Sequence, residues 1–183
     1  MPNAISKLFA VILAILVLYY VPTYQIYKKQ EDLAYLNTYE TVTAFVDNVR
    51  MKGYITPQMY EDFQKKLIIG DVLYDVEMTH KHKLYVPVYS DPANPNSFTR
   101  EYQVHYSEYY ETQILDVLYG DPTKSIEQRT YKLENGDFFS LYVENKTKFK
   151  STMVLDFLTG AITKDNEVVV SVPYGGMILN EDY

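Results

Sequence analysis

The chain has 183 residues, enough for one domain plus an anchor but too few for two domains with separate cores. Its net charge of -7 and its lack of a concentrated basic face argue against a nucleic-acid partner. It has no cysteine, which excludes disulfides, thiolate metal sites and a cysteine nucleophile. A single acidic domain held together by packing alone is therefore expected.

An uninterrupted apolar run, LFAVILAILVLYYV, occupies residues 8 to 21, between Lys7 and Pro22. As a helix it spans about 21 Å, less than the roughly 30 Å of a hydrocarbon core. Continuing the helix through Tyr27 supplies the missing length, with tyrosines suited to the interface and lysines at its outer edge. The residues expected to contact lipid or to pack in an assembly are Leu8, Phe9, Val11, Ile12, Leu13, Ile15, Leu16, Leu18 and Pro22.

This segment fits either a membrane anchor or a secretory signal peptide. An apolar run after one lysine also resembles a secretory signal peptide, but the following VPTYQIYKK has no small-residue cleavage site. We therefore predict a membrane anchor over residues 1–28 and a single domain over residues 29–183. The charges flanking the span are nearly balanced, and the short N-terminal tail favours placing the domain outside the cell.

After Lys29, apolar residues recur at steps of three and four, which predicts an amphipathic helix. We expect this helix to end at Gly53. Residues 8 to 51 are then predicted to form one continuous helix, in which Pro22 can introduce a kink. Acidic positions such as Glu31 fall off the apolar stripe. The residues expected to pack this helix on the domain are Tyr35, Tyr39, Val42, Val46 and Val49.

Local signals define several further elements. Thr56 followed by Pro57 predicts the start of a second helix, which we expect to end at Gly70. Residues 71 to 89 alternate like two strands, with a turn expected at 80–83. Residues 90 to 97, SDPANPNS, form the clearest loop.

The pattern of the C-terminal half predicts one helix followed mainly by strands. We predict a helix over residues 107–118 and a hairpin at Asn135-Gly136, followed by a last strand broken near residues 175 and 176. Residues 151 to 158 fit a short helix or a strand equally well. The expected fold is α+β, with a long N-terminal helix packed on an antiparallel β-rich domain with one or two short helices.

Few residues suggest chemistry. His80 and His82, with Asp71, Asp75 and Glu77 nearby, have metal-ligand side chains, and alternate residues of a strand share a face. The sequence singles out no further ligand, so a solvated hairpin tip explains them. Motifs of hydrolases, phosphate-binding loops and metalloproteases are absent from the sequence. We expect no enzymatic activity, no cofactor and no metal.

The layout of a short tail, an apolar helix containing a proline, an amphipathic continuation and a β-rich domain resembles type IV pilins and pseudopilins. Two segments, TAFVDNVRMKGYITPQMYEDFQKKL (residues 43 to 67) and LYDVEMTHKHKLYVPVY (residues 73 to 89), are similar to pilin-like proteins of Gram-positive bacteria associated with tight-adherence pilus genes. The resemblance implies a membrane-held subunit of a pilus or secretion pseudopilus, whose partners are other subunits or assembly proteins. The glycine and glutamate that type IV pilins usually carry near the start of this helix are absent here, which favours a minor or accessory subunit.

The alternative is a permanently anchored surface binding protein. The chain carries 20 tyrosines, and tyrosine suits half-exposed strands and protein interfaces alike. A tyrosine-rich recognition face would then carry the function.

Overall fold

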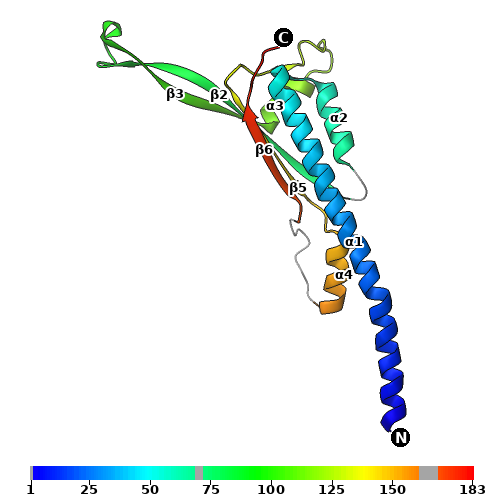
Figure 1. Cartoon of the computed structure of the whole chain (residues 1–183). Helices are drawn as coiled ribbons and strands as arrows, with labels where there is room; N and C mark the ends of the chain where they lie inside the picture. The colour runs from blue at the N-terminus through cyan, green and yellow to red at the C-terminus, as the bar shows by residue number, and fades with distance from the viewer. Residues whose placement is uncertain (1, 69–71, 161–168) are drawn as a thin grey trace.

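A computed structural model describes residues 2–68, 72–160 and 169–183. One helix, α1 (Pro2–Lys52), runs the full length of the molecule, and its second half packs on the domain (Figure 1). This confirms the predicted α+β fold with a long N-terminal helix. The helix continues through Pro22 without interruption.

The domain is built on a four-stranded antiparallel sheet. Its strands are β2 (Tyr74–Tyr89), β3 (Phe98–Tyr110), β5 (Phe138–Asn145) and β6 (Ser171–Met177), in the spatial order β3-β2-β5-β6. A separate antiparallel pair joins β1 (Tyr54–Ile55) to β4 (Tyr131–Lys132). The sheet therefore contains the only long strands among the described residues.

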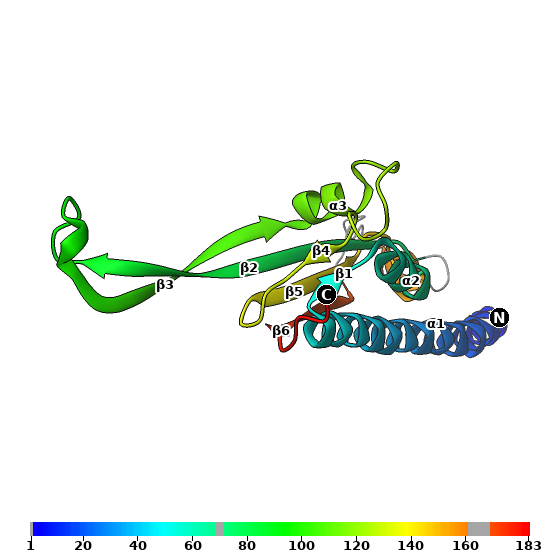
Figure 2. The same cartoon turned by 90° about the horizontal axis from the view of Figure 1, so that it is seen from above.

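The remaining elements are short helices. They are α2 (Pro57–Leu67), the 3-10 helix η1 (Pro95–Ser97), α3 (Glu111–Tyr119) and α4 (Lys150–Thr159). Helix α2 contacts α1 through the Phe45 and Phe63 rings, whose centroids are 4.6 Å apart, and it contacts α3 through the Tyr60 and Tyr119 rings. Figure 2 shows α1, α2 and α3 arranged around the sheet when the molecule is seen from above.

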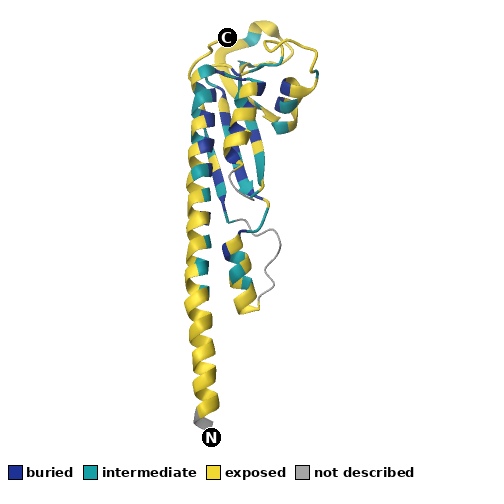
Figure 3. Cartoon of the chain, turned by 90° about the vertical axis from the view of Figure 1, so that its right-hand side faces the viewer, coloured by how far each residue is buried: buried dark blue, intermediate teal, exposed yellow. Residues whose placement is uncertain are grey.

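The core lies between the sheet and the second half of α1. Strand β5 follows the period of two, burying Phe139, Leu141 and Val143 while the intervening residues are less buried. Figure 3 shows the same contrast on α1, whose lower half is exposed while its upper half turns buried residues toward the sheet.

The predicted packing stripe of α1 is partly wrong. Val42, Val46 and Val49 are fully buried, but Tyr35 and Tyr39 are 43% and 47% exposed. The buried face is rotated at this level and includes Glu31, Thr38 and Thr41. At the lower end of this face Glu31 accepts a hydrogen bond from Ser151 of α4, a contact that the local pattern does not reveal.

The end of α1 is fixed by the C-terminal tail. Gly53 follows the helix with φ 75°, as predicted for a terminating glycine. The backbone N–H groups of Leu179 and Asp182 donate to the carbonyl oxygens of Arg50 and Lys52, at 2.8 and 2.9 Å. The tail therefore satisfies carbonyl groups that a helix end leaves unpaired.

The second predicted helix starts as expected. The Thr56 hydroxyl accepts a hydrogen bond from the backbone N–H of Met59, and Pro57 is the first helical residue. The helix ends at Leu67, and the predicted stop at Gly70 lies outside the described residues. The segment that fitted two structures, residues 151 to 158, is helical and belongs to α4.

The turn predicted at residues 80–83 is wrong, because β2 continues straight through it. Each of these residues has a partner on β3, from His80 opposite Tyr109 to Lys83 opposite Tyr106. The pairing satisfies the backbone groups that a turn would leave exposed, and the actual turn falls at the predicted loop of residues 90–97. For the same reason residues 107–110 belong to β3, so α3 begins at Glu111 rather than at residue 107.

Two predictions for the last strands also need correction. Asn135-Gly136 forms a turn, but β4 pairs with β1 rather than with β5, so the flanking strands make no hairpin. Strand β6 is not broken at its glycines. A Cβ atom on Gly176 would lie 2.5 Å from Arg50 Nε, so this glycine gives room for the arginine inside a continuous strand.

Candidate functional site

The first half of α1 presents an apolar surface that the domain leaves open. Residues 4 to 19 are all exposed, including every predicted lipid-contacting side chain from Leu8 to Leu18, and Pro22 is exposed as well. Among the described residues, α1 is the one helix long and apolar enough to cross a membrane. From Lys7 to Lys28 the helix rises about 32 Å, close to the thickness of a hydrocarbon core of about 30 Å.

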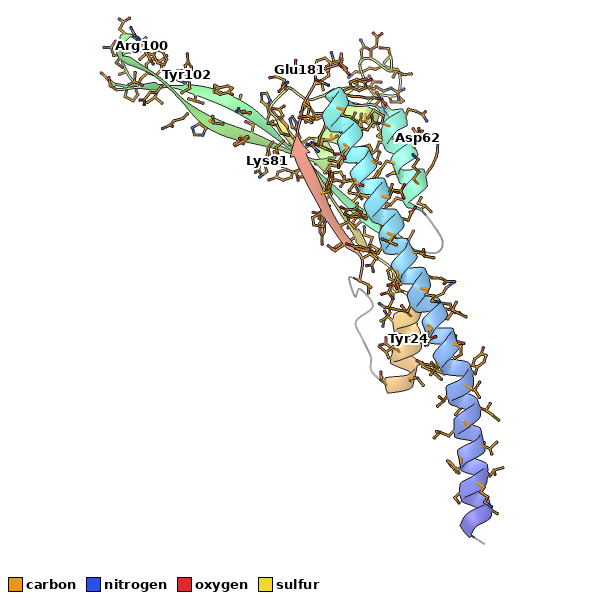
Figure 4. All side chains as sticks on the ribbon, in the orientation of Figure 1. Tyr24, Asp62, Lys81, Arg100, Tyr102 and Glu181 are labelled. Carbon is orange, nitrogen blue, oxygen red and sulfur yellow. The ribbon has the colours of Figure 1, made fainter. Side chains whose placement is uncertain are left out.

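Helix α4 lies beside α1 near the outer end of this apolar surface. The Tyr20 hydroxyl donates to the carbonyl oxygen of Val154, and the Ser151 hydroxyl donates to the carboxylate of Glu31. Lys28 pairs with the same carboxylate, and so the buried charge of Glu31 is neutralised. Figure 4 shows Tyr24 at the level of α4, on the stretch of α1 that α4 accompanies.

Helix α4 also exposes apolar side chains. Phe157 is 86% exposed, and Met153, Leu155 and Leu158 are exposed as well. The charged Asp156 among them is paired with Lys148. The sequence did not single out Glu31 or α4, because their contact joins segments 120 residues apart.

A second site is built where β2 passes under the turn before β5. Met78, His80 and His82 alternate on β2, so both imidazoles lie on the core-facing side, as the shared-face argument predicts. The turn at residues 134–137 places the carboxylate of Asp137 between them. Asp137 Oδ2 lies 2.8 Å from His80 Nε2, and Asp137 Oδ1 lies 3.0 Å from His82 Nδ1.

Backbone and side-chain contacts hold this cluster rigidly. The N–H groups of Lys83 and Glu134 donate to Asp137 Oδ1 and Oδ2, each at 2.9 Å. His80 Nδ1 lies 2.7 Å from the Tyr131 hydroxyl, and the Tyr109 ring stacks on the His80 ring at a centroid distance of 5.5 Å. A cavity of about 500 Å³ opens beside the cluster.

The environment of the cluster favours an ionised aspartate and a neutral His80. Burial alone would raise the pKa of Asp137, but hydrogen bonds from two backbone N–H groups and two histidines outweigh it and lower the pKa below its usual value. Burial lowers the pKa of His80, and the neighbouring Asp137 offsets that effect only in part. Because the carboxylate can only accept, His80 Nε2 donates to it, and the free lone pair of Nδ1 accepts from the Tyr131 hydroxyl.

These histidines therefore do not form the solvated hairpin tip that the sequence suggested, because β2 is continuous and His80 is buried. The acids expected near them lie elsewhere: Asp75 pairs with Lys146 at 2.7 Å, Glu77 is exposed, and Asp71 falls outside the described residues. The carboxylate that does converge, Asp137, is 55 residues from His82 in the sequence. Only the turn signal at Asn135-Gly136 marks its neighbourhood.

A third feature is the arm formed by β2 and β3 beyond the main sheet. Pairing with β5 ends at Lys81, whereas pairing with β3 continues to Tyr89, so a two-stranded ribbon projects from the domain (Figure 1). Exposed aromatic side chains line it, among them Tyr85, Tyr102 and Tyr106. Figure 4 places Arg100 and Tyr102 near its outer end.

Comparisons with known proteins give no match among family models, curated proteins or solved structures.

Proposed function

We propose that the protein is a membrane-anchored structural or accessory subunit of a type IV pilus-like or pseudopilus-like assembly. The observation that carries this proposal is the division of α1 into two halves. Its second half is fixed to the sheet, while residues 4 to 19 expose an apolar surface to their surroundings. In water such a surface is unfavourable by about 25 cal/mol for each Å² of apolar area, so it requires lipid or other apolar helices.

The shape of α1 supports its use both in the membrane and in the core of a filament. The continuous rod holds the domain at the outer edge of the membrane while the subunit waits there. Packing against the helices of neighbouring subunits would bury the same side chains in a filament core. The apolar run is short for a permanent anchor, which eases its departure from the bilayer.

A groove beside α1 supports packing against another apolar helix. It has a volume of about 790 Å³ and lies where α1 and the start of α4 meet. Its lining includes Tyr27, Leu33, Ala34, Phe149 and Met153. The groove extends the apolar surface of α1 toward the domain, so a helix packed on α1 would contact it too.

The second candidate function is a permanently anchored binding protein. The observation in its favour is the exposed aromatic arm of β2 and β3, which contributes little to the core. Tyrosine rings at the end of a ribbon suit recognition of another envelope protein. In this case α1 acts only as a tether.

Shearing of cells separates the two functions. The sheared surface fraction and the detergent-soluble membrane fraction are each probed for the native chain. A pilus-like subunit is expected in high-molecular-weight surface filaments. Exclusive retention in the membrane fraction would contradict assembly and support the anchored binding protein.

A further inference from the structure

The cluster of His80, His82 and Asp137 has the donor set of a metal site. One ligand atom from each residue lies within 4.8 Å of the other two. We propose that these three side chains bind a divalent transition-metal ion of the zinc class. This site is independent of the proposed role in assembly.

The choice of ion follows from the ligand chemistry. Two imidazole nitrogens and one carboxylate oxygen suit borderline ions such as Zn²⁺, whereas Ca²⁺ and Mg²⁺ prefer oxygen ligands alone. Zinc bonds to these atoms measure about 2.0–2.2 Å, so ligand atoms around a tetrahedral ion lie about 3.3 Å apart. Asp137 Oδ2 lies 2.8 Å from His80 Nε2 and 3.1 Å from His82 Nδ1, close to this value, and the three ligand atoms all lie within 4.8 Å of one another. Small side-chain movements would therefore admit the ion.

The carboxylate is already oriented for this role. Each oxygen of Asp137 accepts one backbone N–H, from Lys83 or from Glu134, and keeps a lone pair directed at the histidines. In the ion-free protein the histidine N–H groups occupy those lone pairs. An ion would replace these two hydrogen bonds, with each displaced histidine proton moving to the other ring nitrogen or to solvent, and would leave the backbone contacts undisturbed.

Tyr131 supplies the outer contact that metal-binding histidines usually have. When Nε2 of His80 binds an ion, its proton moves to Nδ1, which then donates to the Tyr131 oxygen 2.7 Å away. The Tyr131 hydroxyl rotates so that it accepts rather than donates. The same contact thus serves the ion-free and the ion-bound forms, and it fixes the orientation of the ring.

The site also has access to solvent and an unfilled position. His82 is partly exposed, and the residues lining the adjoining cavity of about 500 Å³ include His80, His82, Glu134 and Asp137. Three protein ligands leave a fourth position of a tetrahedral ion open to water. The acidic character of the chain, with its net charge of -7, favours the approach of a cation.

Binding is tested on the full-length chain in detergent without an affinity tag, stripped with a chelator and titrated with Zn²⁺ by calorimetry. We expect binding of one ion for each chain and a rise in thermal midpoint on addition of Zn²⁺. Replacement of Zn²⁺ by Co²⁺ gives a visible absorption band that reports the coordination directly. Absence of stoichiometric binding by the unmodified chain would overturn the proposal.

Three variants locate the ion. His82→Gln removes a partly exposed ligand and should weaken binding at least about tenfold. Tyr131→Phe keeps all three ligands and should also weaken binding by about tenfold, with a changed Co²⁺ spectrum. His105→Gln, on exposed β3, is the matched control and should bind like the unmodified chain. Equal losses in the His105 and His82 variants would place the ion elsewhere and overturn the assignment.

Discussion

The contacts of Asp137 join strand β2 to the turn before β5. Its carboxylate, 1% exposed, accepts hydrogen bonds from β2 and from its own turn, and both histidines lie against it. Replacing it with Asn keeps the shape but removes the charge and one acceptor. We expect Asp137→Asn to lower the free energy of unfolding by about 3 kcal/mol, because it leaves buried donors unpaired.

Urea denaturation in the presence of a chelator measures this difference without a contribution from bound ions. The control is Asp62→Asn on α2, whose exposed carboxylate lies 3.9 Å from Lys65. The control should change stability by less than about 0.5 kcal/mol. Equal effects of the two substitutions would contradict the structural role of Asp137.

His80 makes stability depend on pH. Its pKa in the folded protein lies below the ordinary value of 6.5, so the unfolded chain binds the proton more readily. The stabilisation of the fold by neutral His80 is therefore complete above about pH 6.5. It is lost as the pH falls through the pKa of His80 in the folded protein. The lowered pKa of Asp137 acts in the same direction at lower pH, below its ordinary value of 3.8.

The charged and titratable groups that act on His80 are Asp137, His82 and Glu134. We expect acidification from about pH 7 to about pH 5.5 to lower the thermal midpoint of the chelator-treated protein. His80→Gln removes the titrating group and should show a smaller decrease over the same interval. A larger decrease in His80→Gln would contradict the assigned sign.

The junction of α1 with the C-terminal tail depends on Gly53. A Cβ atom there would lie 2.2 Å from the carbonyl oxygen of Asn180, and the residue has φ 75°. We expect Gly53→Ala to lower the free energy of unfolding by about 2 kcal/mol or more, from backbone strain and displacement of the tail.

Gly160 provides the comparison for Gly53→Ala. It has a similar φ of 63°, but a Cβ atom would meet nothing within 4 Å. Gly160→Ala should therefore lower the free energy of unfolding by only about 1 kcal/mol, the cost of a positive φ for alanine. Denaturation of both variants separates strain from collision, and equal losses would argue against the close packing of the tail.

The elements that the sequence predicted correctly are those specified by neighbouring residues. Thr56 and Pro57 start α2, Gly53 ends α1, and the loop at residues 90–97 joins two strands. The errors arise where a distant segment decides the outcome. Residues 80–83 look like a turn until β3 pairs with them.

In the candidate metal site, too, local features could be predicted and long-range contacts could not. The shared face of His80 and His82 follows from the period of a strand, and it could be predicted. Asp137 reaches them only through the path of the chain before β5, and Tyr131 only because β4 pairs with β1. No local pattern of residues predicts these long-range contacts. The exposure of Tyr35 and Tyr39 likewise depends on which side of α1 the domain covers.

The exposed apolar surface of α1 should retain the chain in membranes. The variant Leu13→Asp with Leu16→Asp places two charges in the middle of the apolar surface, at a cost of about 3 kcal/mol for each acid in a bilayer. We expect the double variant to leave the membrane fraction. The control is Tyr85→Asp with Tyr102→Asp on the arm, which should remain in the membrane fraction.

We propose that the apolar half of α1 is covered in the cell while the domain faces outward. Because the chain contains no cysteine, single-cysteine variants can be labelled selectively on intact cells with a membrane-impermeant maleimide. Leu16→Cys, on the apolar surface, should remain unlabelled, and Gln58→Cys, on exposed α2, should be labelled rapidly. Rapid labelling of Leu16→Cys would show that lipid or other subunits do not cover the helix. Protection of Gln58→Cys would contradict the outward placement of the domain.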